Sequence, residues 1–158
     1  MATTILSEHR VLIDVPLPAL NGANATEATA TFSLPADFID TDLVDLPVLS
    51  FRVDTADDGA TPLDGLVIEL RSSSTNDFAV PGTNNQLEAT CTFNSNVAQT
   101  LHEVINSGSL DSAVATNAFQ FAITGGTGQA TISDIVLLVK REVTGPVNTM
   151  TGSGVGGD

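Results

Sequence analysis

Apolar and polar side chains alternate one by one along most of this chain. Successive residues of an extended strand point to opposite faces, so this period of two is typical of strands that bury one face. Few segments show the periodicity of a helix, and only residues 35–45 and 109–114 could each form a helical turn. The sequence therefore predicts an all-β fold. The candidate strands are residues 11–15, 28–34, 49–54, 66–71, 89–94, 119–123 and 132–139.

Turn-forming residues separate these segments at 57–59, 64–65, 81–82 and 125–128. Seven or eight short antiparallel strands joined by such turns predict a β-sandwich, with the jelly roll as the expected arrangement. The glycine-rich segment 125–128 is expected to form a hairpin turn between Ile123 and Ile132. Pro16 and Pro18 directly follow the first candidate strand, which favours an edge position for it.

The composition limits how the core can be built. There are seven Phe residues but no Trp and no Tyr, so the interior must consist of aliphatic side chains, Ala and Phe. A length of 158 residues suits one domain. We assign residues 11–143 to the sandwich, residues 1–10 to an N-terminal arm and the glycine-rich residues 144–158 to a C-terminal tail.

Acidic residues outnumber basic ones by 19 to 5, for a formal net charge of −14. Such a surface repels phosphate backbones and anionic lipid heads, so neither nucleic acid nor membrane is an expected partner. No basic segment followed by an apolar stretch begins the chain, and no run of 18 apolar residues exists. We expect synthesis in a host cytoplasm without export by a signal peptide.

Catalytic residue patterns are absent from the sequence. His9 and His102 lie far apart and neither accompanies a nucleophile motif, so a hydrolase triad is not indicated. Cys91 alternates with Ala89 and Phe93, which predicts a buried, inert thiol. The sequence therefore predicts a protein that is not an enzyme and that has no cofactor.

Calcium is the least implausible ion. Asp54, Asp57 and Asp58 precede Gly59, and carboxylates on one loop could bind a hard cation. Their spacing does not match an EF-hand, and acidic turns are more often simply solvated. A second acidic group is formed by Asp37, Asp40, Asp42 and Asp45.

The last third of the chain carries one family-like pattern. Residues 117–121, a glycine turn and residues 130–137 together look like the closing hairpin of jelly-roll sandwiches. The segment of isoleucine, a polar residue, aspartate and isoleucine resembles the last strand of galactose-binding-like and carbohydrate-module jelly rolls. That resemblance implies a fold more than a function. The absence of Trp and Tyr counts against stacking on a sugar ring.

General character gives a second resemblance. Small, acidic, lysine-poor β-sandwiches with glycine-rich tails are similar to capsid decoration (cement) proteins and small coat proteins of phages or archaeal viruses. This resemblance implies a virion structural protein whose partners are other copies of itself and a major capsid or other virion protein. Val136 and Leu138 are the candidate interface residues, because they are apolar where a strand should turn polar residues outward.

The alternative function is a non-catalytic module that binds a ligand, such as a carbohydrate. A cleft with an exposed Phe38 or Phe78 would favour that alternative.

Overall fold

The computed structural model describes residues 6–22, 25–34, 46–59, 61–106, 110–111 and 116–142. Within these ranges the chain forms strands and no helix. The nine strands are β1 (Leu6–Ile13), β2 (Leu20–Asn21), β3 (Glu27–Phe32), β4 (Val48–Ala56), β5 (Asp64–Ser73), β6 (Gln86–Phe93), β7 (Ala98–Val104), β8 (Asn117–Thr127) and β9 (Gln129–Glu142).

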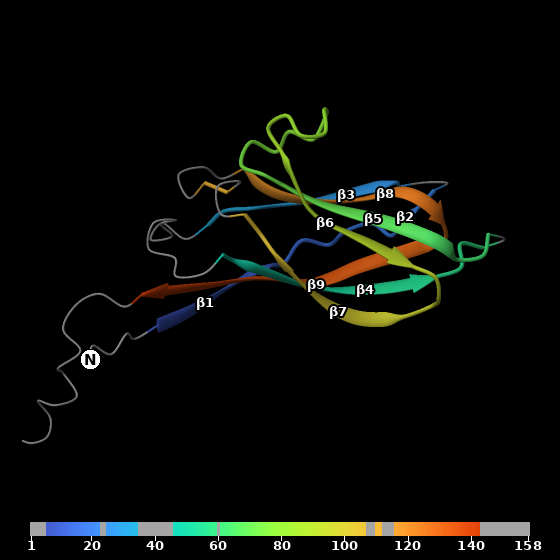
Figure 1. Ribbon diagram of the computed structural model, residues 1–158, viewed down its shortest axis with the longest axis horizontal. Helices are drawn as coiled ribbons and strands as arrows, with labels where there is room; N and C mark the ends of the chain where they lie inside the picture. The colour runs from blue at the N-terminus through green and yellow to red at the C-terminus, as the bar shows by residue number, and fades with distance from the viewer. Residues whose placement is uncertain are drawn as a thin grey trace, which may run out of the picture.

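The strands form two antiparallel sheets that pack face to face (Figure 1). Sheet A has the order β1-β9-β4-β7, with the two-residue β2 also paired to β9. Sheet B has the order β3-β8-β5-β6. Apart from β2, the chain changes sheet at every connection except β5 to β6. Eight strands in this order form a jelly roll, which confirms the predicted fold class.

The core lies between the sheets and consists of the inward members of each alternation. In β4, for example, Leu49, Phe51 and Val53 are buried while their neighbours are half exposed. One ring pair joins the two sheets across the interior, since Phe51 on β4 meets Phe121 on β8 edge-on at 5.0 Å between centroids. A second pair lies within sheet B, where Phe32 stacks on Phe119 of the neighbouring strand at 5.1 Å. Aliphatic residues, Ala and Phe supply the described core, as the composition predicts.

A bulge in β9 explains why its sequence is so continuously apolar. Asp134 adopts a positive φ of 52°, and the register with β4 shifts at this point. Ile132 faces the core before the bulge, and Ile135 and Leu137 face it after the bulge. The bulge therefore resets the alternation and directs Val136 and Leu138 to the outer face of sheet A.

The prediction of a hairpin at 125–128 is wrong. β8 pairs with β3 and β5, whereas β9 pairs with β1, β2 and β4, so the two strands belong to opposite sheets. Gly125 and Thr127 instead pair with β5. The chain crosses from one sheet to the other here. For the same reason residues 117–121 and 130–137 do not form the closing hairpin that their sequence resembles.

The first strand is an edge strand, as expected, but it starts earlier than residue 11. β1 begins at Leu6, whose register partner is Glu142 in β9. Residues 6–10 of the proposed arm are thus part of the sheet, and both ends of the described domain leave sheet A side by side. Residues 1–5, the tail from 143 onward, and the candidate helical turns at 35–45 and 109–114 lie outside the described residues, apart from 110–111.

Candidate functional site

The structure separates the residues that sequence reasoning tested for catalysis. His9 lies on β1, and His102 lies exposed on β7, the opposite edge strand of sheet A. Cys91 is half buried on β6, and its Sγ lies 3.9 Å from Oε1 of Glu103. Burial and the nearby Glu103 carboxylate both raise the pKa of the Cys91 thiol, which lowers its nucleophilicity at neutral pH.

The three calcium candidates do not share one site. The Asp54 carboxylate accepts hydrogen bonds from Arg52 Nε at 3.0 Å and Nη2 at 3.2 Å. Asp57 Oδ1 accepts the backbone N–H of Leu63 at 3.0 Å, and Asp58 forms a backbone bridge with Thr61. Within the described ranges, no group of three or more His, Cys, Asp or Glu side chains is placed to hold a metal ion. The second acidic group, residues 37–45, lies outside those ranges.

An apolar patch lies on the outer face of sheet A. Cross-strand pairing places Leu12 opposite Val136, and Leu138 opposite Val48, which in turn pairs with Val104. Leu12 is 68% exposed and Val104 is 55% exposed. The apolar patch, as used below, consists of Leu12, Val48, Val104, Val136 and Leu138. Both interface candidates from the sequence, Val136 and Leu138, belong to it.

The outer face of sheet B has a different composition. Its strands turn Thr, Gln, Glu and Arg side chains outward, and Gln120 Nε2 lies 3.5 Å from Thr29 Oγ1. Arg71 binds Glu69 on the same face at 3.3 Å. The outer face of sheet B is thus mostly polar, with Leu87 of β6 exposed beside Arg71. The outer face of sheet A instead presents several contiguous apolar side chains, which is typical of a contact surface.

Charges around the apolar patch are balanced, although the chain as a whole is strongly acidic. Arg10 pairs with Glu8 at 3.4 Å and Arg52 pairs with Asp54 at 3.0 Å, each pair on one strand of sheet A. Four of the five Lys and Arg residues of the chain, Arg10, Arg52, Lys140 and Arg141, belong to sheet A strands. The same strands carry five acidic residues, Glu8, Asp54, Glu103, Asp134 and Glu142, so sheet A holds little of the net negative charge of the chain and should repel a second acidic molecule only weakly.

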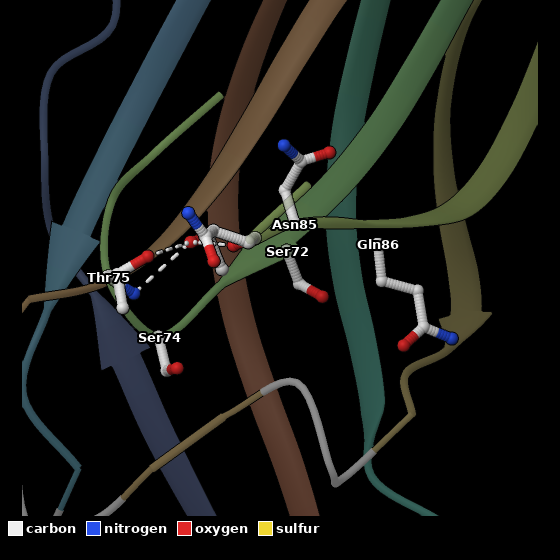
Figure 2. A pocket seen from close by; sticks show the side chains of 7 residues that line it. Ser72, Ser74, Thr75, Asn85 and Gln86 are labelled. Atoms are coloured by element: carbon white, nitrogen blue, oxygen red, sulfur yellow. Dashed lines mark hydrogen bonds between the residues drawn. The ribbon is translucent and has the colours of Figure 1, made fainter. Parts of the chain in front are cut away.

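A polar pocket lies where β5 ends and β6 begins. It has a volume of about 280 Å³ and is lined by Ser72, Ser73, Ser74, Thr75, Asn84, Asn85 and Gln86. All seven side chains are uncharged hydroxyls or amides. In Figure 2 the side chains of Ser72, Ser74 and Gln86 lie on one side of the ribbon, whereas Asn85 points to the other.

Hydrogen bonds hold the wall of this pocket in place. Asn85 Nδ2 lies within 3.0 Å of the backbone oxygens of Asp77, Val80 and Thr83, and Arg71 donates to its Oδ1 at 3.1 Å. Ser73 Oγ donates a hydrogen bond to the backbone oxygen of Asn84 at 2.6 Å and accepts hydrogen bonds from the backbone amides of Thr75 and Asp77. The loop between β5 and β6 is therefore internally fixed.

Sequence reasoning missed the pocket. Ser, Thr and Asn between two strands indicate a loop, and nothing in their spacing shows which side chains fix the loop and which line a hollow. Phe78, proposed as an aromatic platform, is half buried in this loop and is not among the lining residues. Phe38 lies outside the described residues.

Comparison with known proteins adds little. No family model matches the sequence, and no curated protein matches it. Among solved structures, the chain is similar to the K3 cleaved adhesin domain of Lys-gingipain from Porphyromonas gingivalis W83. The identity is 11% and the TM-score 0.41, with 84% of this chain and 99% of that chain covered. A similarity of this strength indicates neither family nor function.

A search for helices long and apolar enough to cross a membrane found none in the part of the chain that the structure describes.

Proposed function

We propose that this protein is a non-catalytic structural protein that associates with a second copy of itself through the outer face of sheet A. The observation that carries the proposal is the apolar patch, with Leu12 68% exposed at its edge strand. Burying an exposed Leu side chain contributes about 1.5–3 kcal/mol, and a two-fold contact would bury it in both copies.

The charge distribution also favours this face, because sheet A strands carry four of the five basic residues of the chain. Two molecules of net charge −14 repel one another, and the repulsion is weakest where acidic and basic groups are paired. The pairs Glu8–Arg10 and Arg52–Asp54 provide that condition beside the apolar patch. A face with its own balanced charges can also meet an identical face, as a two-fold contact requires.

Sedimentation equilibrium of the full chain and of a Leu12→Glu variant tests the proposal. We expect a concentration-dependent dimer for the natural sequence and at least about tenfold weaker association for Leu12→Glu, because a carboxylate would be buried in the contact. The matched control is Val80→Glu, since Val80 is 58% exposed on the β5–β6 loop, away from sheet A. A monomer at all concentrations, or equal effects of the two substitutions, would overturn the proposal.

The more specific proposal is a virion role, as a capsid decoration or small coat protein. Jelly rolls occur in viral capsid proteins and also in lectin domains, so the fold is compatible with this role by analogy alone. One observation supports it: Leu6 and Glu142, the first and last described residues, are register partners on sheet A, so two arms would begin at the same place. Removal of residues 144–158 should lower the amount of this protein that stays bound to purified virus particles, without changing the unfolding transition of the domain. Unchanged retention would contradict the arm role.

A further inference from the structure

We propose that the polar pocket between β5 and β6 binds a small neutral polyhydroxylated molecule, such as a single neutral sugar. The pocket belongs to the end of sheet B, whereas the apolar patch belongs to the outer face of sheet A. The inference is therefore independent of self-association, and either can fail without the other.

The first argument is the chemistry of the lining. Hydroxyls and carboxamides both donate and accept hydrogen bonds, which matches a ligand whose hydroxyl groups do the same. No lining side chain is charged, and none is a large apolar group. An apolar ligand would gain little here, and a multiply charged ligand would lack a counter-charge.

The second argument is that some lining residues form hydrogen bonds within the protein, whereas others do not. The side chains of Ser73 and Asn85 form hydrogen bonds with the backbone of the loop itself. Ser72 Oγ donates a hydrogen bond to the Glu88 carboxylate at 2.5 Å. Ser74 and Gln86 are half buried, and neither side chain has a hydrogen-bond partner in the described structure. Together they present a hydroxyl and a carboxamide that can bind a ligand without breaking any hydrogen bond within the loop.

The third argument is rigidity. Because Asn85 and Ser73 already fix the backbone around the pocket, binding would not have to order the loop. The Arg71 side chain anchors this wall to sheet B, since it donates to Asn85 and pairs with Glu69. A prearranged wall favours a weak but specific interaction with a small ligand.

Charge and size narrow the ligand class. Asp77 accepts a hydrogen bond from Asn84, and Glu88 accepts one from Ser72, so two carboxylates border the pocket. The nearby cation, Arg71, is already paired with Glu69, so the net charge around the pocket opposes an anionic ligand. A volume of about 280 Å³ lies just below the usual range of ligand pockets, which suits one sugar ring better than an oligosaccharide. Without an aromatic side chain in the lining, the expected Kd is on the order of millimolar.

Titration of the full chain with D-glucose and with D-glucuronate, followed by amide NMR shifts, tests the proposal. These probes differ only in one carboxylate. We expect saturable shifts confined to residues around 72–76 and 84–88 with D-glucose, and binding at least about fivefold weaker with D-glucuronate. Ser74→Ala and Gln86→Ala should each weaken D-glucose binding by about fivefold, the effect of losing one hydrogen bond.

Gln99→Ala is the matched control, because it removes the same carboxamide from an exposed position on β7. This variant should bind D-glucose like the natural sequence. The proposal is overturned by the absence of saturable shifts with D-glucose, by equal binding of both probes, or by unchanged binding in the Ser74→Ala, Gln86→Ala double variant.

Discussion

Leu12 on β1 and Val136 on β9 are direct cross-strand partners, and both point away from the core. Paired apolar residues on an outer sheet face normally signal a covering layer, but the described structure places no third layer over sheet A. The interior of this sandwich is already filled by other side chains of the same two strands, such as Ile13 and Leu137. The pair is therefore surplus to the core and is available for contact with another molecule.

Self-association through this pair should strengthen with salt. At low ionic strength, two chains of net charge −14 repel each other over tens of ångströms, whereas the apolar contact itself does not depend on screening. Raising sodium chloride from about 20 mM to about 500 mM shortens the screening length from roughly 20 Å to roughly 4 Å. Sedimentation equilibrium should then show a lower dimer Kd. If association weakened with salt, ion pairs between copies rather than apolar contact would hold the dimer.

Cys91 should react slowly with a thiol reagent in the folded protein. Burial, followed by the Glu103 carboxylate, raises the thiol pKa, so less reactive thiolate is present at pH 8 than in an unfolded chain. Glu103→Gln removes the charge and should accelerate the reaction at pH 8. Glu27→Gln is the control, since it removes the same charge from β3, at the opposite edge of the sandwich. Equal rates for folded and urea-unfolded protein would contradict this account.

The contribution of Asp77 to stability should be lost in acid. Hydrogen bonds from the Asn84 side chain and from the Ala79 amide hold the pKa of Asp77 below its ordinary value of 3.8. A carboxyl whose pKa is lower in the folded state stabilises that state above the unfolded-state pKa, and this contribution disappears as pH falls through the folded-state value.

Urea unfolding of the natural sequence and of Asp77→Asn at several pH values measures that contribution. Asp77→Asn should be the less stable at pH 7, and the difference should shrink below about pH 4. Asp64→Asn controls for the loss of one negative charge. A difference between the natural sequence and Asp77→Asn that stayed constant with pH would show that the charge of Asp77 is irrelevant.

The alternation of side chains was sufficient to predict the fold class, because burial of one sheet face imposes a period of two on central strands such as β4 and β5. Thus β4 and β5 include the predicted segments 49–54 and 66–71. The edge strand β7 is mostly exposed and was not among the candidate strands, since an exposed edge imposes no such period. Candidate interface residues Val136 and Leu138 could be found for the same reason, as apolar residues out of phase with burial.

Contacts between residues distant in sequence could not be predicted in this way. The polar pocket depends on which backbone groups the Asn85 and Ser73 side chains bind once the loop has closed. The path of residues 125–128 depends on what the loop meets, and glycines that permit a hairpin equally permit a crossing between sheets.

Gly126 and Gly82 provide a test of that crossing. Both adopt a positive φ, 74° and 81°, which costs an Ala residue about 1–2 kcal/mol. A Cβ at Gly126 would overlap the backbone of Gly65, whereas a Cβ at Gly82 would meet nothing within 4 Å. Gly82→Ala should therefore lose only the conformational term, and Gly126→Ala should lose at least about 2 kcal/mol more, because backbone atoms cannot move aside as a side chain can. Urea unfolding of the two variants gives the difference directly. Equal losses would mean that the 125–128 connection does not pack against β5, and the crossing between sheets would then have to follow another path.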